Sequence, residues 1–309
     1  MKHDLTYDSY LDKTRIHYSV FDHDTPKALV LMIHGLAEHR ARYDALATRI
    51  ASFGYIVLTI DQRGHGQTGA DMIFGDFGET DGWMRNIGDI ISIQHFIQHK
   101  YKTPTVILFG HSMGSVVARS LLKHHGAEYS GCVLSGIPTL PPALSFLHPT
   151  MKIICNIMGQ TKPSHLFYAL TFKSFDRKHR SLTKNAWLSV DEANVQAYTD
   201  DPWCGFTLTY RGVVQFLSGM VDVSFLKAKN NHYKDKPIWI VVGLKDPSAN
   251  HPQDLEKTKR CLTIQGYSNI TTTLDPFSQH EVFFDVNATT LNHELFMFIE
   301  SIPKTSASE

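Results

Sequence analysis

The stretch Phe109–Ser115, FGHSMGS, decides the fold because it holds a serine between two glycines in the pattern G-x-S-x-G. The residues before the first glycine, TVILF, have the composition of a buried strand, and apolar residues return at helical spacing after the motif. Strand, sharp turn and helix form the context in which this motif exposes a nucleophilic serine, so we interpret Ser112 as a nucleophile. Gly110 and Gly114 let neighbouring backbone pass close to the turn.

Similar strand-like runs recur along the chain and alternate with helix-like segments. An alternating pattern near the N-terminus, residues 5–21, predicts an antiparallel edge pair. Further strands are expected at 28–33, 55–60, 105–109, 131–135, 237–243 and 271–274, and helices at 43–53, 82–100, 253–265 and 290–301. Asp81 is the expected N-cap of the second helix. This alternation predicts an α/β fold with a mostly parallel eight-stranded sheet flanked by helices.

The alternation is interrupted after Pro138. From there to about residue 209 the sequence contains no clear strand and several apolar, helix-like stretches. We therefore predict a helical cap at 138–215, inserted into a core formed by 1–137 and 216–309. The apolar cap residues 144–158 and 166–168 are expected to line an acyl pocket and pack on the core, and we leave transient membrane-surface contact open.

Composition excludes several classes of partner and site. Lys plus Arg and Asp plus Glu both total 30, so the formal net charge is zero and gives no overall electrostatic attraction for nucleic acid. The cysteines have no C-x-x-C spacing and are expected to be buried thiols, as in a reducing cytosol; they are Cys132, Cys155, Cys204 and Cys261. Residues 1–10 are polar, and no apolar run is long enough to span a bilayer. We expect a cytoplasmic protein, with peripheral membrane association left open.

A nucleophilic serine needs a histidine base and a carboxylate that orients the histidine. For a serine in this type of turn the chain order is serine, acid, histidine. Asp246 follows one late predicted strand and His280 follows the next, at the edge where α/β sheets place their sites. Asp275 is an alternative candidate for the triad carboxylate, because it follows the same predicted strand as His280. We therefore predict a triad of Ser112, Asp246 and His280.

The reaction also needs two N–H donors for the oxyanion of the tetrahedral intermediate. One comes from the residue after the nucleophile, Met113, and the other from the loop after an early strand, at Leu36. Histidines are frequent near these loops, but no H-E-x-x-H or paired-cysteine pattern supports a metal site. We therefore expect neither a metal nor a cofactor.

Four motifs in this order resemble the monoglyceride lipase and lysophospholipase branch of the α/β-hydrolases, a serine aminopeptidase-type family. They are HGLAEH at 34–39 with RY at 42–43, DQRGHG at 61–66, GHSMG at 110–114 and QHE at 279–281. The resemblance extends from about Arg15 to Ser301, and in the cap WLS (187–189) and DPWCGF (201–206) resemble a bacterial lysophospholipase-like pattern.

The resemblance implies hydrolysis of an acyl ester, most simply a monoacylglycerol or lysophospholipid, through an acyl-serine. It also implies supporting roles around the site for His34, Gly35, Glu38, Arg42, Arg63 and His111, although the charged members could equally be solvated surface residues. One departure is Asp285, where relatives often carry an Asn-Glu pair.

Two alternatives stay open. The first is a proline-iminopeptidase-like peptidase, whose substrate amine needs an acidic anchor such as 191–192 or 200–201. The second is a ligand receptor on the same scaffold that does not turn over its ligand. The oligomeric state is not predicted.

Overall fold

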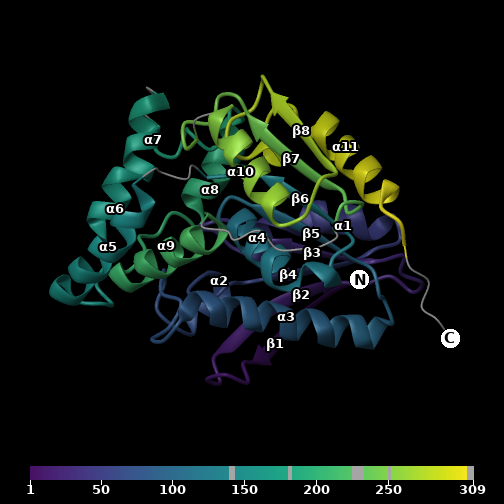
Figure 1. The fold of residues 1–309 in the computed structure, drawn as a ribbon, viewed down its shortest axis with the longest axis horizontal. Coiled ribbons are helices and arrows are strands. Elements are labelled where there is room, and N and C mark those ends of the chain that lie inside the picture. Colours follow the sequence, from purple (N-terminus) through teal and green to yellow (C-terminus); the bar gives the residue numbers. More distant parts are fainter. Residues whose placement is uncertain (139–142, 180–182, 225–232, 250–251, 305–309) are drawn as a thin grey trace.

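An eight-stranded sheet runs through the centre of the computed structural model, in the order β1-β2-β4-β3-β5-β6-β7-β8 (Figure 1). The structure describes residues 1–138, 143–179, 183–224, 233–249 and 252–304. The strands are β1 (Lys2–Asp8), β2 (Arg15–Phe21), β3 (Leu29–Ile33), β4 (Ile56–Ile60), β5 (Val106–His111), β6 (Gly131–Ser135), β7 (Ile238–Gly243) and β8 (Ile270–Asp275). β2 pairs antiparallel with β1 and β4, and every other neighbouring pair is parallel. The predicted mostly parallel sheet with an antiparallel pair at one edge is confirmed.

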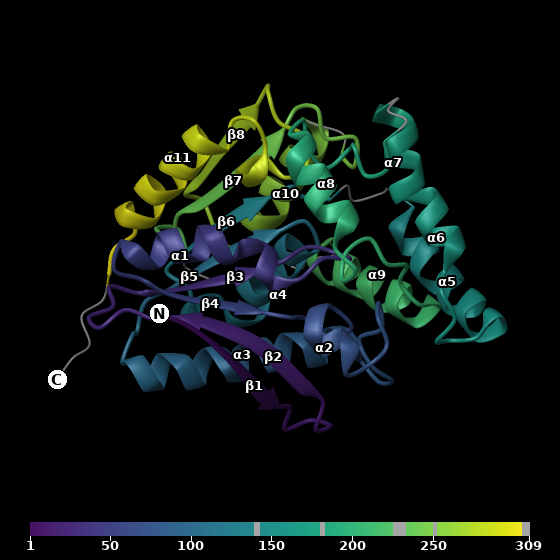
Figure 2. The same cartoon turned by 180° about the vertical axis from the view of Figure 1, so that it is seen from behind.

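Helices cover both faces of this sheet, as Figures 1 and 2 show from opposite sides. One face carries α1 (Asp44–Ser52) and α11 (Ala288–Ser301), and the other carries α3 (Gly82–Tyr101), α4 (Met113–His125), α9 (Tyr210–Ser224) and α10 (Gln253–Ile264). Side chains alternate along a strand, so Val30 and Met32 pack with α1 while Leu31 and Ile33 pack toward α4. Burial on both faces explains why the central strands read as continuous apolar runs.

Short elements lie in the connections. They are α2 (Gly66–Ala70) and the 3₁₀ helices η1 (Arg40–Tyr43), η2 (Gly126–Glu128) and η3 (Val282–Phe284). Asp81 occupies the N-cap position of α3, as predicted, but its φ is 46° and its side chain makes no capping hydrogen bond. All four cysteines are free; Cys132 and Cys155 are buried, and Cys204 and Cys261 are half-buried. No helix among the described residues is long and apolar enough to cross a bilayer.

The cap consists of α5 (Leu144–Met158), α6 (His165–Leu170), α7 (Phe172–His179) and α8 (Glu192–Asp200). Helix α9 connects the cap to the core, because it packs against α5 as well as against α3 and α4. The proposed boundary between residues 215 and 216 falls inside α9, so one continuous helix belongs to both parts. The division into core and cap stays a prediction.

The parallel register brings the ends of several strands to one edge of the sheet. Ile33 of β3 lies beside Gly110 of β5, and His111 lies beside Ser135 of β6. At the next junction Gly243 of β7 lies beside Asp275 of β8. The segments that leave these strands therefore meet at one place, which is where open α/β sheets hold their sites.

Candidate active site

Ser112 occupies a sharp turn between β5 and α4. Its φ is 52° and its ψ is −119°, a conformation that is costly for a residue with a side chain. A Cβ on Gly110 would lie 2.4 Å from the Gly114 carbonyl oxygen, and one on Gly114 would lie 2.1 Å from the Ile33 oxygen. The tight turn therefore needs glycine at both positions. Strain at a serine held between two obligatory glycines indicates a functional constraint rather than a packing preference.

Asp246 and His280 form a buried pair beside this turn. Their side chains follow β7 and β8, and His280 Nδ1 lies 2.7 Å from Asp246 Oδ2. Burial alone would lower the pKa of His280, but the Asp246 carboxylate raises it above its ordinary value. Burial would likewise raise the pKa of Asp246, and its hydrogen-bonded partners hold it below the usual range. Asp246 is therefore ionised at neutral pH and can orient the histidine through Nδ1, which leaves Nε2 for a substrate or nucleophile.

The rival acid, Asp275, lies elsewhere in the same region. Its two carboxylate oxygens accept hydrogen bonds from the Ser278 backbone N–H at 2.9 Å and from the Asn287 side chain at 2.9 Å. Asp275 therefore braces the loop that carries His280 without contacting the imidazole.

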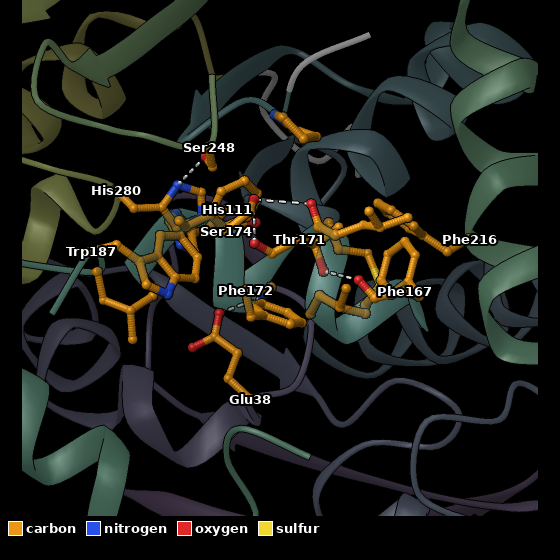
Figure 3. A pocket seen from close by; sticks show the side chains of 18 of the residues that line it. Glu38, His111, Phe167, Thr171, Phe172, Ser174, Trp187, Phe216, Ser248 and His280 are labelled. Atoms are coloured by element: carbon orange, nitrogen blue, oxygen red, sulfur yellow. Dashed lines mark hydrogen bonds between the residues drawn. The ribbon is translucent and has the colours of Figure 1, made fainter. Parts of the chain in front are cut away.

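Ser248 is a contact of this pair that the sequence reasoning missed. Its hydroxyl donates to Asp246 Oδ1 at 2.6 Å, and its Oγ lies 3.2 Å from His280 Nδ1 (Figure 3). The Ser248 backbone N–H also donates to Asp246 Oδ1 at 2.8 Å. The available signal was Asp-Pro-Ser, because an aspartate that accepts from the backbone two residues later forms an Asx turn. Asp246 uses one oxygen for this turn and the other for the histidine.

Two rings flank the His280 imidazole. The Trp187 ring lies 4.9 Å from it, and the His111 ring lies 4.8 Å away. Burial and the neighbouring His280 lower the pKa of His111 to about 3, so His111 stays neutral. Its Nδ1 lies 3.2 Å from the Ser135 hydroxyl. His280 is therefore the member of this histidine pair that can exchange a proton near neutral pH.

The loop of residues 34–39, which we call the oxyanion loop, lies opposite the N-terminus of α4. Leu36 and Met113 both line the cavity in front of Ser112. The Gly35 N–H is taken by Glu38 Oε1 at 2.5 Å, whereas the Leu36 N–H donates to no described group. Met113 begins α4, and the first amides of a helix have no partner within it. These two N–H groups match the predicted donors, and their role remains a proposal.

His34 fixes the start of the oxyanion loop. Burial lowers its pKa to about 4, so the ring is neutral. Its Nε2 accepts the Gln62 backbone N–H at 3.1 Å, which leaves Nδ1 to donate to the Gly35 carbonyl oxygen at 2.8 Å. Both nitrogens are therefore engaged, and the ring holds the Gly35 peptide in one orientation.

Arg42 connects the oxyanion loop, the His280 loop and the cap. Its guanidinium lies 2.5 Å from Glu38 and 2.6 Å from Glu281, and all three side chains are largely buried. The Asn194 amide of α8 donates to Glu281 at 2.7 Å, and the guanidinium stacks 4.9 Å from the Tyr198 ring. Burial would raise the pKa of Glu281, but Arg42 lowers it to about 2. Ion pairs of Glu38 and Arg42 were expected, whereas the part played by Glu281 and α8 was not.

Arg63 does not join this group. Its guanidinium pairs with Asp89 of α3 at 2.6 Å and with Asp12 between β1 and β2 at 2.7 Å. The supporting role predicted behind the oxyanion loop therefore has to be corrected, because these ion pairs fasten the edge hairpin to α3. The DQRGHG motif gave no indication of this, since both partners are distant in sequence.

Asp285, a departure from the family pattern, ties the cap to the His280 loop. One oxygen accepts the backbone N–H groups of Val190 and Asp191, and the other accepts the Gln279 N–H at 2.7 Å. The cap segment before α8 is thereby held against the residue that precedes His280.

Ser112 lines a cavity of about 320 Å³. Figure 3 shows side chains that line this cavity. In the figure His280 and Ser248 lie toward one side, whereas Phe167 and Phe216 lie toward the other. Most of its remaining lining is apolar and comes from the cap and α9, including Leu147, Phe172, Phe175, Trp187, Leu217 and Met220. A reactive polar end and an apolar remainder suit a ligand with a polar reacting group and an apolar tail.

One group of described residues could offer metal ligands, namely His39, Asp201 and Cys204, whose ligand atoms lie within 4.8 Å of one another. His39 Nε2 is hydrogen-bonded to Asp201 Oδ2 at 2.7 Å, and burial raises the pKa of the Cys204 thiol. A protonated thiol is a poor ligand, and none of the three lines the cavity. The group is better explained as a hydrogen-bonded link between the oxyanion loop and the cap.

Comparison with known proteins agrees with this architecture. The family described as serine aminopeptidase, S33 matches residues 24–287. Monoacylglycerol lipase of Mycolicibacterium smegmatis is 32% identical over 213 residues, which cover 67% of each chain. Monoglyceride lipase of Mus musculus is 34% identical over 179 residues, 58% of this chain and 52% of that protein, so the match spans about half of the mouse protein.

Solved structures share the fold. A thermostable carboxyl esterase from Bacillus coagulans superposes with a TM-score of 0.86 at 24% identity, covering 97% of this chain and 98% of that one. A monoglyceride lipase variant from Saccharomyces cerevisiae gives a TM-score of 0.72 at 20% identity, covering 98% and 96%. The chain belongs to the serine aminopeptidase S33 family of α/β-hydrolases.

Proposed function

We propose that this α/β-hydrolase cleaves carboxylic (acyl) esters through an acyl-serine intermediate, with monoacylglycerols as the first candidate substrates. The observation that carries the proposal is the Asp246–His280 pair beside a strained serine that faces an apolar cavity. The monoacylglycerol and monoglyceride lipases among its relatives support the same reaction class.

Acylation begins when Ser112 Oγ attacks the ester carbonyl carbon while His280 Nε2 takes its proton. The negative charge that develops on the carbonyl oxygen is stabilised by the N–H groups of Leu36 and Met113. The ionised Asp246 carboxylate stabilises the His280 imidazolium and does not itself accept the proton. When the tetrahedral intermediate collapses, His280 returns the proton to the leaving alcohol, and the acyl group stays on Ser112.

Deacylation repeats these steps with water in place of the alcohol. His280 takes a proton from the water, the hydroxide oxygen attacks the acyl carbon, and the same two N–H groups stabilise the second intermediate. Collapse releases the carboxylic acid and returns the proton to Ser112. The residues needed for both halves belong to this chain alone.

The charge of the cavity favours a neutral substrate. Among the described residues that line it, Lys178 is the one lysine or arginine, and its ammonium donates to the Pro247 carbonyl oxygen at 3.1 Å. A lysophospholipid would bring a phosphate that needs a cationic partner. Monoacylglycerol therefore ranks ahead of lysophospholipid in this proposal.

The peptidase alternative needs a free carboxylate to bind a substrate amine. The acidic residues considered for this role, 191–192 and 200–201, do not line the cavity. The lining carboxylates are Glu38 and Glu281, and Arg42 pairs with both of them. This arrangement supports an ester substrate over an aminoacyl substrate.

A substrate panel tests the proposal. Wild type and Ser112→Ala are assayed with monoacylglycerols of increasing chain length, lysophosphatidylcholine, a p-nitrophenyl acyl ester and an aminoacyl-nitroanilide. We expect turnover of the esters that is lost in Ser112→Ala, with monoacylglycerol preferred. Preference for the nitroanilide would favour the peptidase, and absence of turnover across all substrates would favour the receptor.

A further inference from the structure

The Trp187 side chain carries a buried N–H group that has no acceptor in the protein. Trp187 is 3% exposed and lines the same cavity as Ser112. Its indole Nε1 has no hydrogen-bond partner among the residues that the structure describes. Leaving a buried N–H unpaired is costly, and buried polar groups in folded proteins are rarely without a partner. The unpaired donor therefore indicates an acceptor that a ligand in the cavity supplies.

The rings packed against the indole do not supply this acceptor. The Phe172 and Phe175 rings lie 5.9 and 4.9 Å from it, and they carry no nitrogen or oxygen. The third neighbour is the His280 imidazole at 4.9 Å. Its Nδ1 is already hydrogen-bonded to Asp246, and Nε2 is the atom that exchanges a proton with the reacting groups.

The two carboxylates that line the cavity are engaged as well. Glu38 accepts the Gly35 N–H with one oxygen and the Arg42 guanidinium with the other. Glu281 accepts two hydrogen bonds from Arg42 and one from the Asn194 amide. These partners come from the protein and keep both carboxylates in place, so the indole N–H remains available to a bound molecule.

The position of the indole is fixed by the His280 loop. The Glu281 N–H donates to the carbonyl oxygen of Leu188, the residue after Trp187, at 2.9 Å. Asp285 accepts two further backbone N–H groups of the same cap segment. Trp187 is therefore held beside His280 by main-chain contacts as well as by its ring neighbours, and a donor held in this way can select the group it meets.

Trp187 lies at the end of the cavity from which the leaving alcohol departs. His280 gives its proton to the oxygen of the leaving group, so the alcohol has to lie against the imidazole. In Figure 3 the Trp187 indole lies beside His280, whereas Phe167 and Phe216 lie toward the other side of the cavity. Those apolar rings suit an acyl chain. The unpaired N–H therefore belongs to the alcohol side of the cavity.

We propose that the Trp187 indole N–H donates a hydrogen bond to a hydroxyl oxygen of the leaving alcohol, and so selects esters of polyols such as glycerol over esters of simple alkanols. The inference rests on the proposed function and deepens it by naming the residue that recognises the alcohol. In a glycerol ester the carbon next to the ester-bearing carbon carries an oxygen, which an ethyl ester lacks. With the ethyl ester the N–H stays unpaired, and a site with an unpaired buried donor discriminates against that substrate.

Initial rates with two esters of one acid test this role. Wild type and Trp187→Phe are assayed with 1-monooctanoylglycerol and with ethyl octanoate. Phenylalanine keeps an aromatic ring beside His280 and removes the N–H. We expect kcat/KM to fall about tenfold for the glycerol ester and by less than about twofold for the ethyl ester. Trp203→Phe is the matched control, because Trp203 lies between α8 and α9, is half-buried and does not line the cavity. It should change neither rate, and thermal unfolding checks that both variants are folded.

Acyl transfer gives a second measurement, which the wild type alone can answer. The acyl-serine formed from p-nitrophenyl octanoate is offered glycerol or 1-propanol in competition with water. The alcohol oxygen attacks the acyl carbon and gives its proton to His280; the bond from this carbon to Ser112 Oγ then breaks, and His280 returns the proton to Ser112. We expect transfer to glycerol to be at least about threefold faster than transfer to 1-propanol, counted for each primary hydroxyl at equal concentration. Trp187→Phe should lose this preference.

Three results would overturn the role of Trp187 and leave the ester hydrolase proposal standing. They are an equal loss on both esters in Trp187→Phe, no loss on either ester, and equal transfer to glycerol and 1-propanol in the wild type. A wild type that hydrolyses neither ester would instead overturn the proposed function, and this inference with it.

Discussion

The ion pair of Glu281 with Arg42 gives a prediction whose size follows from the structure. The pKa of Glu281 is about 2 in the folded chain, against 4.5 for the free side chain. At about 1.4 kcal/mol for each pKa unit, this difference corresponds to about 3 kcal/mol of folding stability at pH 7. Glu281→Gln keeps the shape of the side chain and removes the charge, so it should cost about that amount.

The pH dependence follows from the direction of the pKa change. Because the folded pKa is depressed, the contribution is complete above the unfolded value near 4.5 and is lost as the pH falls toward about 2. The difference between wild type and Glu281→Gln should therefore shrink from about 3 kcal/mol at pH 7 to about 2 kcal/mol at pH 3.5. For 309 residues the unfolding entropy is about 0.65 kcal/mol/K, so Tm should fall by about 5 °C at pH 7.

Urea and thermal unfolding followed by circular dichroism measure both effects. Glu256→Gln is the matched control, because Glu256 is 64% exposed and pairs with Lys259 on the surface at 3.0 Å. An exposed pair of this kind contributes at most about 0.5 kcal/mol. Equal stability of the two glutamine variants at pH 7, or a cost of Glu281→Gln that does not diminish at pH 3.5, would contradict this role of the ion pair.

Three further predictions concern the reaction itself. Because Asp246 raises the pKa of His280 above 6.5, kcat/KM should rise with pH around a midpoint above 6.5. Asp246→Asn should lower this midpoint and should lower the rate by about 10⁴. An unchanged midpoint would contradict the pairing of Asp246 with His280. Ser248→Ala should lower kcat about tenfold, because it removes the hydroxyl that donates to the Asp246 carboxylate. Ser248→Thr keeps a hydroxyl and should keep the activity. Equal kcat values in the two variants would show that the Ser248 hydroxyl does not support catalysis. Gly35→Ala would place a Cβ 2.7 Å from Glu38 Oε1, the carboxylate oxygen that holds the oxyanion loop, so kcat/KM should fall about a hundredfold. The control is Gly88→Ala, whose Cβ would lie 3.4 Å from its nearest neighbour, Leu11 Cδ1, and which should have little effect on initial rates.

Much of the fold could be predicted because its information is local. The buried central strands are continuous apolar runs, and α3 and α11 begin and end within two residues of the expected helices. Asp81 shows the limit of local prediction, since it occupies the predicted N-cap position but adopts a left-handed conformation and makes no capping hydrogen bond. Capping of a helix N-terminus depends on backbone dihedral angles that the residue type does not determine.

The candidate site divides in the same way. Asp246 and His280 could be predicted because the order of strands brings their loops to one edge of the sheet. The contacts of Trp187 and Asn194 could not, because they depend on how the cap packs across the core. Arg63 was placed wrongly for a related reason: its partners come from distant segments, and an arginine in a loop motif gives no sign of which carboxylate it will meet.

The central claim is that Ser112 is an activated nucleophile. The most direct test is reaction of the folded chain with a fluorophosphonate probe, followed by intact mass measurement and peptide mapping. We expect one adduct per chain on Ser112, slower labelling in His280→Ala, and no adduct in a Ser112→Ala chain that is folded as wild type. A Ser112→Ala chain that is still labelled, or an adduct on another residue of the wild type, would contradict it.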